Sequence, residues 1–226
     1  MNNPQLRRPS EESLQQFLDS QRGLAFTYET VGGAAPRGEL PVGYAVDRLS
    51  VELGRGGELF AAARRGIESW AQFDLGWCEA WPRETPIRTG EVVAVVARSM
   101  GLWWTNAARI VYVVDEVGDE TPNGGLQLEA GIPPLAPPFE GGGLCARFGF
   151  AYGTLPGHVE MGEELFLVEW DQTTDAVTYS ILAFSRPRHP LARLGRPLVR
   201  RLQQRFREDS AAALQRWVNR AVAAVP

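Results

Sequence analysis

The sequence predicts an α+β fold in which a strongly bent antiparallel β-sheet wraps around a long C-terminal α-helix. Segments with strand periodicity follow one another through the second half of the chain, and the last 30 residues carry an apolar stripe at helical spacing. A sheet of that size must bury one face, and only the last helix is long enough to cover it. We expect residues 1–22 to form an N-terminal helical extension and residues 23–226 to form one domain.

Composition excludes several function classes. The 226 residues include 23 basic and 27 acidic side chains, for a net charge of −4, and 44% are hydrophobic, as in soluble globular proteins. Lysine is absent, which excludes Schiff-base enzymes and phosphate loops that use a lysine. The mild acidity argues against nucleic acid as the main partner. We also find no GxSxG, HExxH or GxGxxG motif, and we expect no cofactor.

The ends of the chain and the cysteines indicate the compartment. Residues 1–22 are polar and lack a signal-peptide core, and the longest aliphatic run, Val92 to Ala97, is too short to cross a bilayer. Cys78 and Cys145 show no CxxC spacing, so neither a disulfide framework nor a structural zinc site is predicted. We therefore expect a cytoplasmic protein without an integral membrane segment.

The first third of the chain predicts two helices and two strands. Ser10 is placed to cap a helix that carries Leu14 and Leu18 and ends at Gly23. Strand character follows at 24–30 and 44–53, separated by a loop. Apolar residues then recur at helical spacing from Glu58 to about Phe73.

The middle of the chain predicts antiparallel strands, at 91–98, 105–115, 146–154, 164–170 and 176–184. An insertion at 117–143 separates the second of these from the third, and its 27 residues include seven Gly and five Pro. That composition predicts irregular structure, either a lid over a site or a surface loop.

The C-terminal helix is predicted from Pro197 to Ala223, about 40 Å at 1.5 Å per residue. We expect its outer face to be solvated; this face carries Arg200, Arg201, Arg205, Arg207, Glu208 and Arg216.

One strand has unequal faces. Alternation places Phe148, Phe150 and Tyr152 on one face and Gly149, Ala151 and Gly153 on the other. A bare strand face permits either a sharp bend of the sheet or the close approach of a ligand. If the long helix leaves space beside this strand, the walls of the cavity would be apolar and aromatic.

A turn directly after this strand gathers ionisable residues, which are His158, Glu160, Glu163 and Glu164. An imidazole with carboxylates could act as general acid and base, or the segment could be a polar hairpin with solvated acids. No metal site is predicted, because a zinc site needs another nitrogen or sulfur donor and His189 is 31 residues away.

Arginines concentrate where the last strand meets the last helix, at Arg186, Arg188, Arg193, Arg196 and Arg200. They could pair with the glutamates of the turn or hold an anionic group of a ligand. Arg109, in an otherwise apolar strand, should lie at an edge or be buried with a partner.

At these residues the sequence resembles the family DUF1990, also called UPF0548. The resemblance covers about Leu24 to Ala213 and rests on Trp70-x-x-Phe73-x-x-Gly76-Trp77, Asn106-x-x-Arg109-Ile110-Val111-Tyr112, the run from Gly149 to Glu164, Ser185-Arg186-Pro187, Leu194-Gly195-x-Pro197 and Gln204-Arg205-Phe206. Ala151 and the long insertion depart from the family pattern. The family is similar to the helix-grip superfamily of START proteins, pollen allergens and polyketide cyclases, which implies an apolar cavity between sheet and helix.

Our leading hypothesis is a binding protein for a small apolar or amphipathic molecule. Candidate ligand contacts are Arg109, Gly149, Tyr152, Gly153, Tyr179 and Arg186, with His158 as a further polar anchor. The alternative is a cyclase, dehydratase or hydrolase in which His158 works with Glu160 or Glu163. A third possibility is an interaction module that docks a partner on Trp103 and Trp104.

Overall fold

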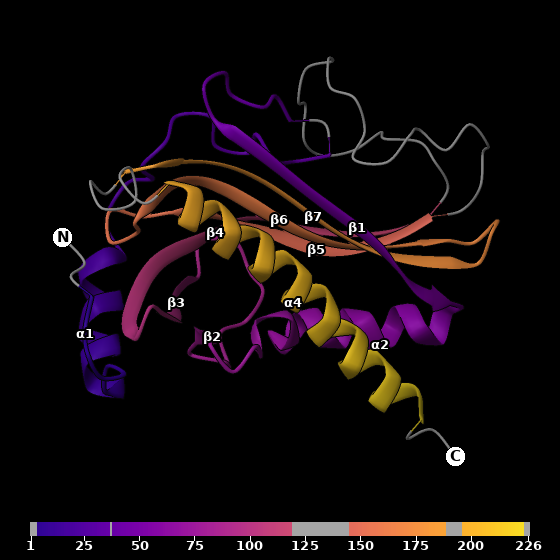
Figure 1. The fold of residues 1–226 in the computed structure, drawn as a ribbon. Helices are drawn as coiled ribbons and strands as arrows, with labels where there is room; N and C mark the ends of the chain where they lie inside the picture. The colour runs from indigo at the N-terminus through magenta and orange to yellow at the C-terminus, as the bar shows by residue number, and fades with distance from the viewer. Residues whose placement is uncertain (1–3, 37, 119–144, 189–195, 224–226) are drawn as a thin grey trace.

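The chain forms a seven-stranded, fully antiparallel sheet with helices on its concave side (Figure 1). This computed structural model describes residues 4–36, 38–118, 145–188 and 196–223. The strand order is β1-β7-β6-β5-β4-β3-β2, so the first strand pairs with the last. A bent antiparallel sheet that holds a long C-terminal helix confirms the predicted fold class.

The elements follow in chain order as α1 (Glu11–Gln21), β1 (Ala45–Arg55), α2 (Gly57–Glu68), the 3-10 turn η1 (Ala71–Phe73), β2 (Cys78–Trp81), β3 (Val92–Ser99), β4 (Leu102–Gly118), β5 (Cys145–Thr154), β6 (Glu160–Asp171), β7 (Ala176–Pro187) and α4 (Arg196–Ala223). Strand periodicity located β1 and β3–β7. The four-residue strand β2 was not predicted, because it is too short to show a period. No helix in these described ranges combines the length and apolar character needed to cross a bilayer.

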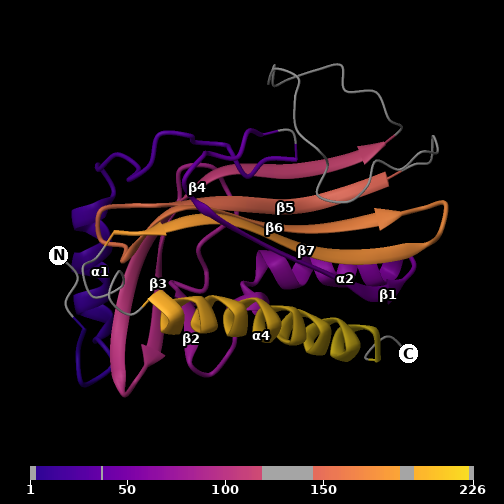
Figure 2. The same cartoon turned by 45° about the horizontal axis from the view of Figure 1, so that its top comes forward.

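The concave face of the sheet packs against α2, η1 and α4 (Figure 2). Ile67 of α2 and Leu214 and Val218 of α4 are fully buried in this core. Gly66 lets the two helices approach closely, since a Cβ there would lie 2.6 Å from Leu214 Cδ1. The second half of α4 is thus fixed by apolar packing.

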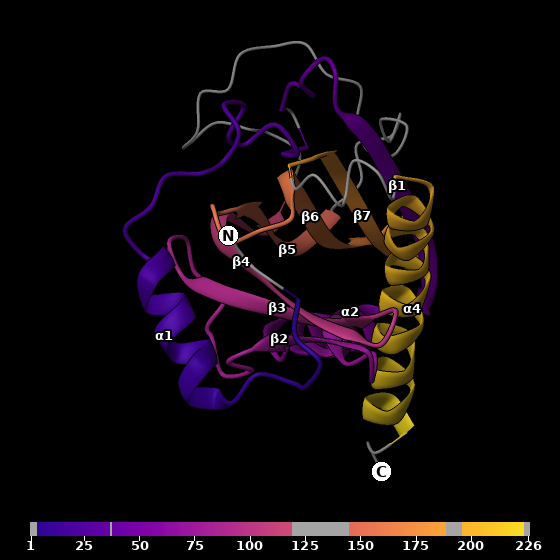
Figure 3. The same cartoon turned by 60° about the vertical axis from the view of Figure 1, so that its left-hand side comes forward.

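The convex face is covered by the N-terminal part of the chain. Leu14 and Leu18 of α1 pack on Ala94 and Val96 of β3, and Figure 3 shows α1 and α4 on opposite sides of the sheet. The segment 24–44 then crosses β5, β6 and β7, where Tyr28 packs on Phe184. Both faces of the sheet are therefore buried over much of its area.

Two local predictions were wrong. Residues 24–30 form no strand; Phe26 and Tyr28 pack on the convex face while the backbone stays irregular. The helix predicted to reach Phe73 ends at Glu68, because Trp70 adopts a left-handed conformation with φ 55°. Of the predicted insertion at 117–143, residues 119–143 lie outside the described residues.

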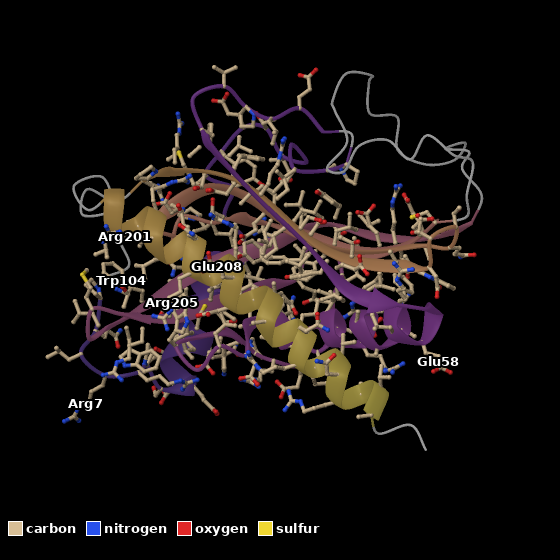
Figure 4. The ribbon with its side chains drawn as sticks, turned by 45° about the vertical axis from the view of Figure 1, so that its right-hand side comes forward. Arg7, Glu58, Trp104, Arg201, Arg205 and Glu208 are labelled. Atoms are coloured by element: carbon tan, nitrogen blue, oxygen red, sulfur yellow. The ribbon has the colours of Figure 1, made fainter. Side chains whose placement is uncertain are left out.

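The arginines of α4 do not all face solvent as predicted. Arg200 and Arg207 turn toward the sheet and pair with Asp47 of β1, at 2.5 Å and 3.2 Å. Arg201 and Arg205 remain exposed along the first half of the helix (Figure 4).

The cap of α1 gives a first test. The Ser10 hydroxyl accepts a hydrogen bond from the Ser13 backbone N–H, as the sequence predicted. We expect Ser10→Ala to lower the free energy of unfolding by about 1 kcal/mol, measured by urea titration. Ser10→Asp keeps an acceptor and should match the wild type; equal loss in both variants would contradict the capping role.

Candidate functional site

The ionisable turn predicted from the sequence is divided between the two faces of the sheet. Neighbouring residues of a strand point to opposite faces, and this separates Glu163 from Glu164 on β6. Glu163 lies on the convex side, against the N-terminal segment. Glu164 lies on the concave side, the side of α4, where Tyr152 of β5 is its cross-strand neighbour.

Glu163 holds the N-terminal segment on the sheet. Its carboxylate accepts hydrogen bonds from the Tyr28 hydroxyl at 2.7 Å and from the backbone N–H groups of Gly32 and Ala34 at 2.8 and 3.0 Å. The residue is only 2% exposed, and this burial raises its pKa although the three donors oppose the change. We assign Glu163 a positioning contact with the convex layer.

Gly153 and its neighbours support the same layer. A Cβ on Gly153 would lie 2.1 Å from the Tyr28 hydroxyl oxygen, so the bare strand face makes room for this ring. Thr154 hydrogen bonds with Thr27 through both hydroxyls at 2.6 Å, and the Gly157 N–H donates to the Gln21 side chain at 2.8 Å. Several residues of the run from Gly149 to Glu164 therefore hold the N-terminal segment on the sheet.

Gly149 and the two candidate arginines also lie away from α4. A Cβ on Gly149 would lie 2.1 Å from the carbonyl oxygen of Phe166, so glycine allows the two strands to approach closely. Arg109 donates to the carbonyls of Arg22 and Leu24 at 2.5 and 2.9 Å, beyond the end of α1. Arg186 is exposed, and its guanidinium lies 4.6 Å from the centre of the Tyr44 ring. A ligand beneath α4 would be separated from these groups by the sheet.

His158 lies in the β5–β6 turn beside the backbone of Glu160. Its Nδ1 atom is 3.0 Å from the Glu160 nitrogen, which donates to it. Burial lowers the pKa of His158 to about 4, so the ring is neutral at pH 7. The structure does not bring His158 to the Glu163 carboxylate, whose hydrogen bonds come from the convex layer. His189 and Arg193 lie outside the described residues.

A row of polar groups crosses the concave face beneath the first half of α4. The Tyr152 hydroxyl donates to Glu164 at 2.7 Å, and the register continues through Ala183 of β7 to Asp47 of β1. Asp47 is 7% exposed and binds two arginines of α4, as described above. The first half of the helix thus meets the sheet through ion pairs.

Glu164 is the titratable centre of this row. Burial raises its pKa to about 7, against the lowering effects of the Tyr152 hydrogen bond and the charge of Arg207. Among the described residues, the only hydrogen bond to the Glu164 carboxyl group is the one from the Tyr152 hydroxyl. A carboxyl group with this pKa can both accept and donate a proton near neutral pH.

Aromatic rings fill the space next to this row. Phe73 lies 6.1 Å from Tyr152, 5.3 Å from Phe166 and 5.2 Å from Phe206, measured between ring centres. Tyr179 is fully buried further along, where its hydroxyl lies 3.0 Å from the Ser210 hydroxyl. The middle of α4 therefore rests on a packed aromatic core.

The first half of α4 is less completely covered. Residues of this half that contact the sheet or its core are only half-buried, and these include Gln203, Phe206 and Arg207. The corresponding residues of the second half are buried, and these are Ser210, Ala211, Leu214 and Val218. The change from half-buried to buried residues occurs within one turn of the helix, between Arg207 and Ser210.

Sequence reasoning selected Tyr152 as a ligand contact and noted Glu164 among the ionisable residues of the turn, but it did not pair the two, it overlooked Asp47, and it expected Arg207 to face solvent. The sequence did contain a signal for Asp47. In an alternating strand Asp47 lies on the same face as Leu49 and Val51, both of which pack against the core. Glu164 likewise lies on the same face of β6 as Phe166, which is part of the core. A charged side chain on an apolar strand face marks a buried polar contact. The described residues contain no group of three ligands that could hold a metal ion.

The fold and this site define a helix-grip protein whose sheet carries a polar row beneath the C-terminal helix. Residues 27–213 match the family model of the domain of unknown function DUF1990, and the chain belongs to this family. It is 33% identical to a UPF0548 protein of Dictyostelium discoideum over 218 residues, 90% of each chain, and 28% identical to one of Arabidopsis thaliana over 94% of this chain and 96% of that one. A START superfamily protein from Mycobacterium smegmatis aligns with a TM-score of 0.43 at 12% identity, over 79% of this chain and 99% of that chain.

Glu163→Gln tests the convex anchor. The amide would place an N–H₂ group against a backbone donor, so we expect the free energy of unfolding to fall by about 2 kcal/mol. Hydrogen exchange of the Gly32 and Ala34 amides should become faster. The exposed change Glu12→Gln is the control; unchanged amide protection in Glu163→Gln would refute the anchoring role.

Glu164→Gln tests the raised pKa of Glu164. The folded state binds this proton more tightly than the unfolded state, whose carboxyl keeps an ordinary pKa of 4.5. The contribution of Glu164 to stability is therefore present below pH 4.5 and is lost as the pH rises to about 7. Relative to Glu164→Gln, the wild type should lose about 3 kcal/mol between pH 4 and 8 in urea titrations. Parallel pH profiles would show that Glu164 has an ordinary pKa.

Proposed function

We propose that this protein binds a small amphipathic molecule between the first half of α4 and the concave face of the sheet. The observation that carries the proposal is the Tyr152–Glu164 pair, a hydrogen-bonded acid beneath a helix whose facing residues are only half-buried. Uncompensated burial of a carboxyl group is costly, and a ligand with a matching polar group would offset that cost.

The surroundings define the chemical class of the ligand. Phe206 is half-buried and packs on Phe73 and Phe166, so displacement of the first half of α4 would uncover aromatic walls, which suit a flat apolar body. Glu164 supplies one proton-sharing contact, which suits a single hydroxyl or amino group on that body. Apolar walls with few polar contacts are typical of sites that bind small organic molecules.

The polar contacts that attach the first half of α4 to the sheet suggest how a ligand could enter between them. Its first half meets the sheet through Arg200 and Arg207 on Asp47 and through Gln203 on Ser185, at 3.0 Å for the last contact. Water can replace the contact of Arg200, whose side chain is 40% exposed, more readily than it can replace the apolar packing around Leu214. We infer that the first half of α4 moves aside while the second half stays fixed.

Acid–base chemistry is the second candidate, and the pKa of Glu164 favours this residue for it. A group that titrates near pH 7 has the proton affinity that general acid–base catalysis needs. The alternative based on His158 with Glu160 or Glu163 has less geometric support, because His158 contacts backbone and Glu163 serves the convex layer. We therefore place any catalytic role at Glu164 with Tyr152.

A fluorescent probe tests the binding proposal. 1-Aminoanthracene has a flat apolar body and one amino group, and we expect saturable binding with a blue-shifted emission. Phe206→Trp, which fills the space, and Glu164→Gln, which removes the titrating group, should each weaken binding at least tenfold.

The exposed residue Arg201 on the same half of α4 supplies the control, and Arg201→Ala should bind like the wild type. Binding that is absent in the wild type, or that survives both site variants unchanged, would overturn the proposal.

A further inference from the structure

A groove outside the helix grip has features that the proposed function does not use. A cavity of about 540 Å³ lies between η1 and the second half of α4. Ala71 of η1 and Asp74, which follows η1, line one side of the groove. The other lining residues include Arg216, Trp217 and Arg220 of α4 and Arg83 of the loop after β2. The volume falls within the range of small-molecule sites.

The rim of the groove carries more positive than negative charge. Arg83, Arg216 and Arg220 face one carboxylate, that of Asp74, which pairs with Arg83 at 3.0 Å. Neither Arg216 nor Arg220 forms an ion pair with any residue that the structure describes. The Nε atom of Arg220 donates to the Arg216 carbonyl at 3.3 Å. Two guanidinium groups thus remain available to an anion, and guanidinium binds carboxylate and phosphate through paired N–H donors.

Apolar surface accompanies these charges. Trp217 lines the groove beside Ala71 and Ala213, and its indole N–H donates to the Ala62 carbonyl at 3.2 Å. The hydrogen bond fixes the ring, so its apolar surface is preorganised. A ligand with a flat apolar part would gain contact area there without reordering the side chain.

The segment that forms one wall of the groove contains an unfavourable backbone conformation and an unsatisfied buried side chain. Trp70 holds a left-handed backbone at φ 55°, a conformation that is unfavourable for a residue other than glycine. Gln72 is 0% exposed, and within the described part of the chain neither its amide nitrogen nor its amide oxygen has a hydrogen-bond partner. Strained backbone conformations cluster at functional sites, and a buried polar group without a partner calls for an explanation.

Helix electrostatics alone does not account for this arrangement. Basic residues near the end of α4 complement the negative end of the helix dipole, which would explain Arg216 and Arg220. The dipole does not explain the presence of Arg83, which comes from another part of the chain. It also does not explain the left-handed backbone of Trp70 or the unsatisfied amide group of Gln72.

We propose that this groove binds a small molecule that carries a carboxylate or phosphate group next to a flat apolar group. The anion lies between Arg216 and Arg220, and the apolar group packs on Trp217. The site is separate from the Tyr152–Glu164 pair, so a ligand of either site leaves the other accessible.

Nuclear magnetic resonance can test the groove with three related probes, 1-naphthyl phosphate, 1-naphthoate and the neutral 1-naphthol. The readout is the indole N–H signal of Trp217. We expect both anions to shift this signal saturably, with weaker binding at high salt, and 1-naphthol to bind at least tenfold more weakly. The ratio between the two anions tells whether phosphate or carboxylate is the preferred group.

The double variant Arg216→Ala/Arg220→Ala should weaken anion binding at least tenfold, whereas Arg201→Ala at the other end of α4 should not (Figure 4). The same double variant should bind 1-aminoanthracene like the wild type, which separates failure of this inference from failure of the proposed function. Equal binding of 1-naphthol and the anions, or equal loss in Arg201→Ala, would overturn the inference.

Discussion

The buried carboxylate of Glu163 is the contact on which the arrangement of the rest depends. Three donors from one short stretch of the N-terminal segment converge on it, and together they close the convex face of the sheet. Because Glu163 is committed to that face, strand alternation commits Glu164 to the other, beneath α4. A slip of one residue in β6 would exchange the two carboxylates, leaving three donors unsatisfied on one side and no acid beside Tyr152 on the other. The family motif at the β5–β6 turn thus serves mainly structure, with a single carboxylate left for chemistry.

The C-terminal helix combines two kinds of contact along one continuous rod. Apolar residues around Leu214 pack the second half of the helix against α2. Ion pairs with Asp47 attach its first half to the sheet. Apolar packing is lost when water enters, whereas Arg200, whose side chain is 40% exposed, can exchange its contact with Asp47 for water. We therefore infer that the helix is held most firmly where its aromatic support is complete and is displaced most easily where Tyr152 and Glu164 lie. Its far end borders a second, arginine-rimmed groove, so one helix separates two chemically different surfaces.

The fold was predictable because long periodic segments dominate the chain. The strands around Phe150 and Phe166 and the C-terminal helix each show many repeats of their period, and the Ser10 cap has a local sequence signal. The site was less predictable. Gly153 could have indicated a ligand surface or a bend, and only the tertiary contact with Tyr28, more than a hundred residues away, shows what occupies the space. Spacing alone likewise grouped His158 with Glu163 and overlooked Asp47, because partners from distant strands leave only a weak parity signal in the sequence. The irregular backbone at 24–30 and the turn at Trp70 also depend on tertiary contacts that override local propensity.

The most direct measurement of the central claim is a crystal structure of the protein purified without detergent and soaked with 1-aminoanthracene. The account predicts density for the probe between the first half of α4 and the concave face, with its amino group within hydrogen-bond distance of the Glu164 carboxyl. The account would be contradicted if Phe206 and its neighbours closed over Glu164 at full probe concentration and left no space for the molecule.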